Sequence, residues 1–146
     1  VRSECAENKC KQYGKNWACP PAAGTLEHFN ELFGHYESCI VFQSVATLDG
    51  PFDAKGMEQL GITHAKRCEA FAEGVLELCP NALVLLAGPC MRCKTCTYPD
   101  APCRFPDKCF TPMEGAGLFV NDICKAADIP YNHGRGTLAY NSCVLV

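Results

Sequence analysis

The segment "ALVLLAGPCMRCKTC", residues 82–96, joins an apolar run to a crowded set of cysteines. Residues 82–88 are continuously apolar, which is typical of a strand that is buried on both faces of a sheet. Gly88 and Pro89 end this strand, and Cys90 follows directly. Because functional groups gather beyond the carboxyl ends of strands in open α/β sheets, this junction predicts a site at the sheet edge.

Helices and strands are predicted to alternate on both sides of this segment. Apolar residues at helical spacing indicate the helices, and β-branched and aromatic residues indicate the strands. The expected elements are helix 25–36, strand 39–48, helix 54–79, strand 82–88, a helix from Thr111 to Ala127, and strand 137–146. This order predicts one α/β domain over residues 1–146, with a small, three-stranded, mainly parallel sheet and flanking helices. A split antiparallel arrangement is the alternative.

The predicted last helix has its own start signal. Thr111 and Glu114 have the spacing of a capping box, and Pro112 would occupy the first helical position. We therefore expect this helix to begin directly after the cysteine-rich segment.

The chain holds 13 cysteines among 146 residues. An odd number leaves at least one thiol unpaired if all the others form disulfides, and cysteines two residues apart in a tight loop are poor disulfide partners. Such thiols are good metal ligands. The composition therefore predicts a metal-loaded protein in a reducing cytoplasm.

Charge and hydropathy exclude other classes of partner. The formal net charge is -3 and the basic residues form no block, which argues against nucleic acid. The longest apolar run is far too short to span a bilayer, which argues against a membrane. No catalytic triad, phosphate loop or carboxylate pair stands out, so a small-molecule substrate is unknown and enzymatic activity is left open.

Four cysteines in residues 88–110 follow the spacing C-x2-C-x2-C-x6-C. They are Cys90, Cys93, Cys96 and Cys103. Two-residue gaps let one loop place three thiolates on three irons of a cuboidal cluster, as in bacterial ferredoxins. Structural zinc more often takes two separated C-x2-C pairs. Residues 88–110 are therefore predicted to be a loop that binds a [4Fe-4S] cluster, with zinc as the alternative.

Residues 1–24 are predicted to form an irregular arm with a second set of thiols. These are Cys5, Cys10 and Cys19. An aperiodic arm has few other ways to become ordered, so we expect a second cluster there, giving one or two clusters in all. The fourth ligand is open: Cys109, Cys103, a non-cysteine group or an iron left free for substrate. The alternative is that the arm only folds back over the first cluster.

The other cysteines are expected to be small hydrophobic core residues. They are Cys39, Cys68, Cys79, Cys124 and Cys143. His64 falls on the apolar stripe of the long helix. A core histidine with satisfied hydrogen bonds is the favoured interpretation, and a ligand or proton relay is the alternative.

Aromatic and basic residues flank both sets of thiols. Tyr13 and Trp17 lie between arm cysteines and are expected to shield a cluster from water. Arg92, Lys94 and Arg104 lie beside the loop thiols and would offset the negative charge of a cluster. Ordinary packing and solvated charges are the alternatives for these residues.

Several motifs together carry a family resemblance. They are "C…C…YGK…CPP" from Cys5 to Pro21, "GTLE" from Gly24, "GPC-x2-C-x2-C…CR-x-P" from Gly88 to Pro106, "PMEGAGLFV" from Pro112 to Val120, and His64 with "AFAEG" at residues 70–74. With these motifs the chain resembles a domain-of-unknown-function family of cysteine-rich predicted metal-binding proteins, common in methanogens and other anaerobes. The resemblance implies metal binding by up to seven motif cysteines, and it implies no reaction. Phe110 and Phe119 depart from the pattern, and Cys109 is an added cysteine and a candidate ligand.

Three functions are consistent with these observations. The first is electron transfer or redox assistance to a larger anaerobic enzyme, which would be a protein partner. The second is a cluster with an open iron that serves catalysis or activates a partner enzyme. The third is a structural zinc module for protein contacts.

Overall fold

The computed structural model describes all residues from 1 to 146. In chain order the elements are α1 (Arg2–Ala6), α2 (Leu26–Phe33), β1 (Cys39–Thr47), α3 (Ala54–Leu78), β2 (Leu83–Leu86), the 3-10 helix η1 (Pro106–Lys108), β3 (Thr111–Pro112), α4 (Val120–Ala126) and β4 (Thr137–Leu145). None of these helices has the length and the apolar composition that crossing a membrane requires. The predicted α/β class is confirmed, and α1 adds one short helix to the arm.

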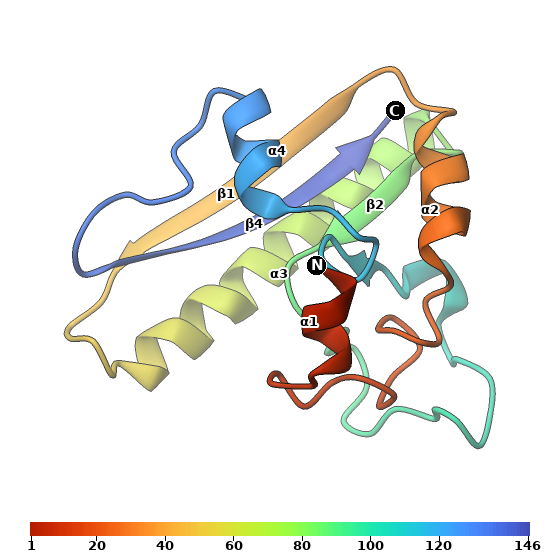
Figure 1. Ribbon diagram of the computed structural model, residues 1–146, viewed down its shortest axis with the longest axis horizontal. Coiled ribbons are helices and arrows are strands. Elements are labelled where there is room, and N and C mark those ends of the chain that lie inside the picture. Colours follow the sequence, from red (N-terminus) through yellow and green to blue (C-terminus); the bar gives the residue numbers. More distant parts are fainter.

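The sheet has four strands in the order β1-β4-β2-β3, and it is mixed (Figure 1). β4 pairs antiparallel with both β1 and β2, and only the short β3 pairs parallel with β2. The prediction of a three-stranded, mainly parallel sheet is therefore wrong. β1 and β2 do point the same way, as a helical crossover through α3 requires, but β4 inserts between them.

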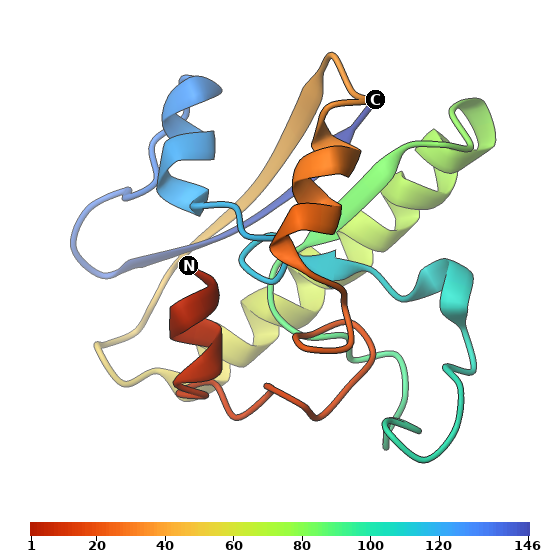
Figure 2. The same cartoon turned by 45° about the vertical axis from the view of Figure 1, so that its right-hand side comes forward.

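Helices cover both faces of this sheet. α3 lies along one face, where it contacts β1, β4 and β2, and α2 and α4 lie against the other (Figures 1 and 2). Val84 and Val144 point to the α3 side and pack with Ala72. Their strand neighbours Leu85 and Cys143 point to the opposite side, because successive side chains of a strand alternate between faces.

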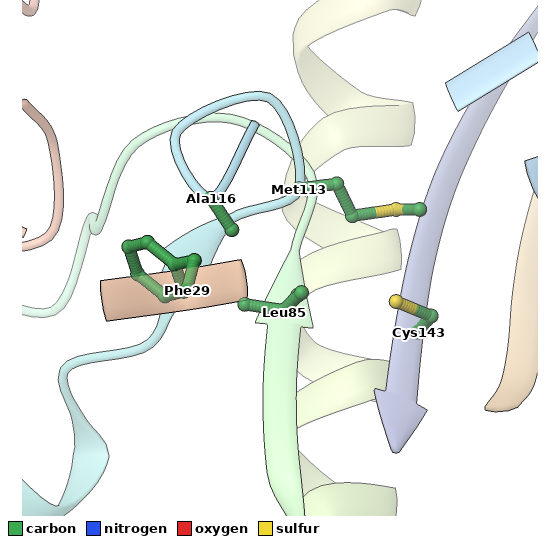
Figure 3. Close-up of a cluster of buried hydrophobic side chains, with 5 residues drawn as sticks. All are labelled: Phe29, Leu85, Met113, Ala116 and Cys143. Carbon is green, nitrogen blue, oxygen red and sulfur yellow. The ribbon is translucent and has the colours of Figure 1, made fainter. Parts of the chain in front are cut away.

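The larger core cluster lies on the side of α2 and α4. Phe29 from α2, Leu85 from β2 and Cys143 from β4 meet Met113 and Ala116 there, all nearly or completely buried (Figure 3). Met113 and Ala116 follow β3 directly. The core therefore anchors the chain on both sides of the cysteine-rich loop, through β2 before it and through the turn after β3.

The predicted capping box at Thr111 is wrong. Thr111 lies in β3 opposite Leu85, and the backbone N–H of Met113 donates to the carbonyl of Leu86 at 2.9 Å. Tight turns follow, and Gly117 has φ +92, a conformation that favours glycine and ends any regular helix. The helix α4 therefore begins only at Val120.

Side-chain caps begin the two longer helices that precede the cysteine-rich loop. The Thr25 hydroxyl accepts a hydrogen bond from the backbone N–H of His28 at 3.2 Å, and this caps α2. The Asp53 carboxylate caps α3 in the same way, at 2.8 Å from the N–H of Gly56. Each cap satisfies an N–H group that has no partner within its helix.

His64 lies between α3 and the sheet and is almost completely buried. Its Nδ1 is 2.9 Å from the Ser44 hydroxyl, and its Nε2 is 2.8 Å from the Ser142 hydroxyl and 3.4 Å from the Cys68 sulfur. Both ring nitrogens are thus occupied by side chains from β1, β4 and α3. The interpretation of a satisfied core histidine is confirmed.

The cysteines predicted to lie in the core divide into two groups. Cys68, Cys124 and Cys143 are buried, as expected. Cys39 and Cys79 are exposed, so the prediction is wrong for these two. Both stand at the end of an element, Cys39 at the first residue of β1 and Cys79 at the C-cap of α3, where the chain leaves the packed layers.

Because burial, and then the charge of Arg67, lower the pKa of His64, acid should destabilise the fold through this residue. The neutral ring contributes its full stability above the unfolded-state pKa of about 6.5, and this contribution is lost as the pH falls further. We expect the free energy of unfolding of the wild type to fall as the pH is lowered from about 7 to 5. Its slope against pH should exceed that of His64→Gln by up to roughly 1.4 kcal/mol per pH unit. Urea unfolding at a series of pH values measures both slopes, and equal slopes would contradict the assignment.

Candidate metal centre

The two cysteine-rich segments come together at one end of the molecule. Figures 1 and 2 show residues 1–24 beside the long loop that leaves β2 and returns to β3. The Trp17 indole N–H donates to the carbonyl of Ala101 at 3.1 Å, and its ring packs edge-on against Tyr98, with 4.9 Å between ring centroids. The arm is thus fastened to the loop by its single tryptophan.

The loop cysteines surround one small, partly enclosed cavity of about 20 Å³, which we call the loop cavity. All four predicted ligands line it, and Cys109 joins them as a fifth thiol. Its lining is Trp17, Cys90, Arg92, Cys93, Cys96, Thr97, Cys103, Arg104, Phe105 and Cys109. The structure therefore brings together thiols that are spread over twenty positions of the sequence, and it places Trp17 where it can shield them.

Hydrogen bonds within the loop hold it in this shape. The Arg104 guanidinium donates to the carbonyl of Thr95 at 2.9 Å, and the Thr97 hydroxyl donates to the carbonyl of Pro102 at 2.8 Å. The 3-10 helix η1 then turns the chain back, so that Cys109 faces the thiols at the start of the loop.

The thiols of Cys90 and Cys109 are direct neighbours. The Cys109 thiol donates to Cys90, and with help from the backbone N–H and the charge of Arg92 this lowers the pKa of Cys90 to about 6. The same interaction, together with burial and the nearby Cys103, raises the pKa of Cys109. The pair shares a proton, so one thiolate is formed at neutral pH, and thiolate is the form that binds metals.

Two arginines supply the positive charge around this cavity. Arg92 forms an ion pair with Glu69 at 3.0 Å, yet its Nε is buried and has no hydrogen-bond partner. Arg104 also lines the cavity, whereas Lys94 is exposed and does not. A buried N–H without a partner is costly, and a sulfur atom inside the cavity would satisfy it.

The arm cysteines line a second, larger space of about 610 Å³, which we call the arm cavity. Cys5, Cys10 and Cys19 all border it, together with Tyr13 and Glu114. The sequence raised Cys103 or Cys109 as a fourth arm ligand, but neither borders this cavity.

Burial, more than any neighbouring charge, raises the pKa of Cys5 and of Cys19. A hydrogen bond from the Asn16 side chain lowers the pKa of Cys19 and so opposes the effect of burial. The Asn16 Oδ1 also accepts hydrogen bonds from the backbone N–H groups of Ala18 and Cys19, at 3.0 and 2.9 Å. The Cys19 thiol lies close enough to Cys90 for their charges to interact, so the two cavities are adjacent. Without a metal, Cys5 and Cys19 stay protonated at neutral pH.

Glu114 is the group in this region that sequence reasoning missed. The sequence suggested a capping role for it, whereas the structure places it on the turn after β3, at the mouth of the arm cavity. Its side chain keeps contact with solvent, but the atoms crowded around it raise its pKa. The sequence signal that could have singled out Glu114 is its position within the motif "PMEGAG".

The thiols of the two cavities approach one another in pairs. The Cys109 thiol donates to Cys90, and the Cys19 thiol is close enough to Cys90 for their charges to interact. No group of three or more His, Cys, Asp or Glu side chains is arranged to hold a single metal ion.

The comparisons with known proteins identify one family. The family described as "Predicted metal-binding protein (DUF2284)" matches the chain over residues 1–146. No curated protein and no solved structure matches the chain. The match covers the arm, the loop and the α/β scaffold alike.

The position of Trp17 provides a direct test of the loop cavity. Because this is the only tryptophan and it borders five thiols, its emission should fall when metal fills the cavity. Adding iron and sulfide anaerobically to the metal-free chain, with emission as the readout, should quench the wild type and Cys39→Ser more strongly than Cys93→Ser/Cys96→Ser. Equal quenching of all three proteins would show that metal binds elsewhere.

Proposed function

The chain belongs to this family of predicted metal-binding proteins, and we propose that its metal is an iron–sulfur cluster of the [4Fe-4S] type. Four thiolates would each bind one iron, those of Cys90, Cys93, Cys96 and Cys103. Cys109 would remain as a fifth thiol beside the cluster. The observation that carries this proposal is the convergence of five soft sulfur ligands on one partly enclosed cavity.

The spacing of these cysteines along the sequence favours a cluster over zinc. Structural zinc more often takes two separated C-x2-C pairs. In a cuboidal cluster each thiolate binds a different iron, and three cysteines at two-residue gaps suit that arrangement.

The surroundings also suit a cluster. When bound, it supplies one-electron transfer and carries negative charge on its sulfur atoms. The backbone N–H of Arg92 bonds to Cys90, and the charge of the Arg92 guanidinium favours the thiolate there, so both would offset this charge. The buried Nε of Arg92 would gain the partner that it lacks. Trp17 covers the cavity and limits the access of water.

We propose that the chain passes electrons to or from a larger redox enzyme in a reducing cytoplasm. The thiols lie near the surface, and two large apolar side chains beside them, Met91 and Phe105, are exposed. Such side chains suit contact with a protein partner, and a centre close to the surface suits electron transfer.

A second function is supported by the arm cavity. Its three thiols and its volume of about 610 Å³ fit a centre with one iron accessible to a small ligand. Such an iron would serve catalysis or the activation of a partner enzyme. It does not replace the loop centre, because the arm thiols border a different space.

The metal and sulfide content of anaerobically purified protein tests the proposal. We expect equal amounts of iron and acid-labile sulfide, little zinc, and broad visible absorption from sulfur-to-iron charge transfer. Cys93→Ser/Cys96→Ser should lose the iron and the absorption of the loop cluster, because two of its four ligands are removed. Cys39→Ser/Cys79→Ser is the matched control, since both of these cysteines are exposed and outside the cavities. Stoichiometric zinc without sulfide would instead establish the structural zinc alternative.

A further inference from the structure

The arm cavity holds ligands that the loop centre does not need. The loop cavity already has five thiols for the four irons of one cluster. Cys5, Cys10 and Cys19 border a separate space, in which the Cys10 thiol acts electrostatically on both other thiols. An arm that only folded back over the loop centre would not need three thiols in a cavity of its own.

Glu114 is placed to complete this set. It lies on a turn that is fixed by the core, since Met113 is buried and its N–H donates to Leu86, and Ala116 N–H donates to Pro112 at 2.9 Å. Its carboxylate borders the cavity and is close enough to Cys5 for their charges to interact. A rigid turn therefore presents a carboxylate to the three thiols.

The Glu114 carboxylate has one hydrogen-bond partner in the structure, the backbone N–H of its own residue. It forms no ion pair with any basic side chain. The other carboxylate that borders the cavity, Glu4, lies 3.5 Å from the Lys9 ammonium and points to solvent. Glu114 is thus the oxygen ligand that this cavity offers.

We propose that Cys5, Cys10, Cys19 and Glu114 bind a second iron–sulfur centre, in which Glu114 is the exchangeable fourth ligand. The inference rests on the proposed iron–sulfur function and assigns a further site to it. Carboxylate oxygen is a harder ligand than thiolate and holds a thiophilic iron less firmly. A small molecule can therefore replace it at that iron.

The cavity also indicates the class of molecule that would bind. Beyond the thiols its lining is mixed: Pro20, Pro89, Phe119, Val120 and Tyr131 are largely apolar, and Ser3, Glu4, Gln12 and Glu114 are polar. The only basic side chain on this lining, Lys9, lies within ion-pair distance of Glu4 and Glu7. A fitting ligand has one anionic sulfur or oxygen donor for iron and a small apolar body. Phe119 and Tyr131 are exposed at this site and leave room for such a body.

Three variants of the full chain test the assignment, each purified anaerobically. Cys5→Ser/Cys10→Ser should lose about half of the iron and sulfide, because one of two clusters is removed. Glu114→Cys should keep the full iron content, because a thiolate replaces the carboxylate. Glu4→Gln is the matched control, since it removes a carboxylate from the same cavity and should behave as the wild type.

Electron paramagnetic resonance of the reduced proteins, with cyanide as the probe ligand, reports the exchangeable position. In the wild type and Glu4→Gln one component of the spectrum should change when cyanide is added. That component should be missing from Cys5→Ser/Cys10→Ser and should no longer respond to cyanide in Glu114→Cys.

Two results would overturn the inference. Full iron content in Cys5→Ser/Cys10→Ser would show that the arm holds no centre, and a cyanide response in Glu114→Cys equal to that of the wild type would show that Glu114 is not the exchangeable ligand. If Cys93→Ser/Cys96→Ser loses iron and Cys5→Ser/Cys10→Ser does not, the proposed function stands and this inference fails. If the wild type contains neither iron nor sulfide, the proposed function fails as well.

Discussion

The parallel pairing of β2 with β3 is the constraint on which both cavities depend. Leu85 lies opposite Thr111, so the chain must leave β2, form the cysteine-rich loop and return to a strand about 4.8 Å away. This closure brings the two ends of the loop together and makes Cys90 and Cys109 neighbours. The same pairing sends the chain through Met113 into the core and presents Glu114 to the arm. A short edge strand tolerates Pro112, which has no N–H to donate.

The scaffold and the thiol-rich end are stabilised by different means. The sheet and its helices bury two apolar clusters, and a hydrogen-bonded histidine joins the long helix to two strands. The arm and the loop have no comparable core and are held by a few backbone contacts, Trp17 and their thiols. Binding of a metal would therefore contribute to their order directly, because metal binding and folding are coupled when the ligands are otherwise unrestrained.

Local patterns in the sequence predicted much of this arrangement. The strand within residues 82–88, the long helix and the buried position of His64 follow from spacing and periodicity. The order of the strands does not, because the insertion of β4 between β1 and β2 depends on contacts far apart in the chain. Thr111 and Glu114 matched a capping box, but pairing with β2 outweighs this local preference. The PMEGAG motif marks Glu114 in the sequence, but its place beside the arm thiols depends on contacts far apart in the chain.

The central claim is that the loop cavity holds iron bridged by sulfide. Anomalous X-ray diffraction from crystals grown without oxygen, collected on both sides of the iron absorption edge, locates iron directly. The account predicts a compact group of iron peaks enclosed by Cys90, Cys93, Cys96 and Cys103. A single peak that appears only at the zinc edge, or iron bound away from these four sulfurs, would contradict it.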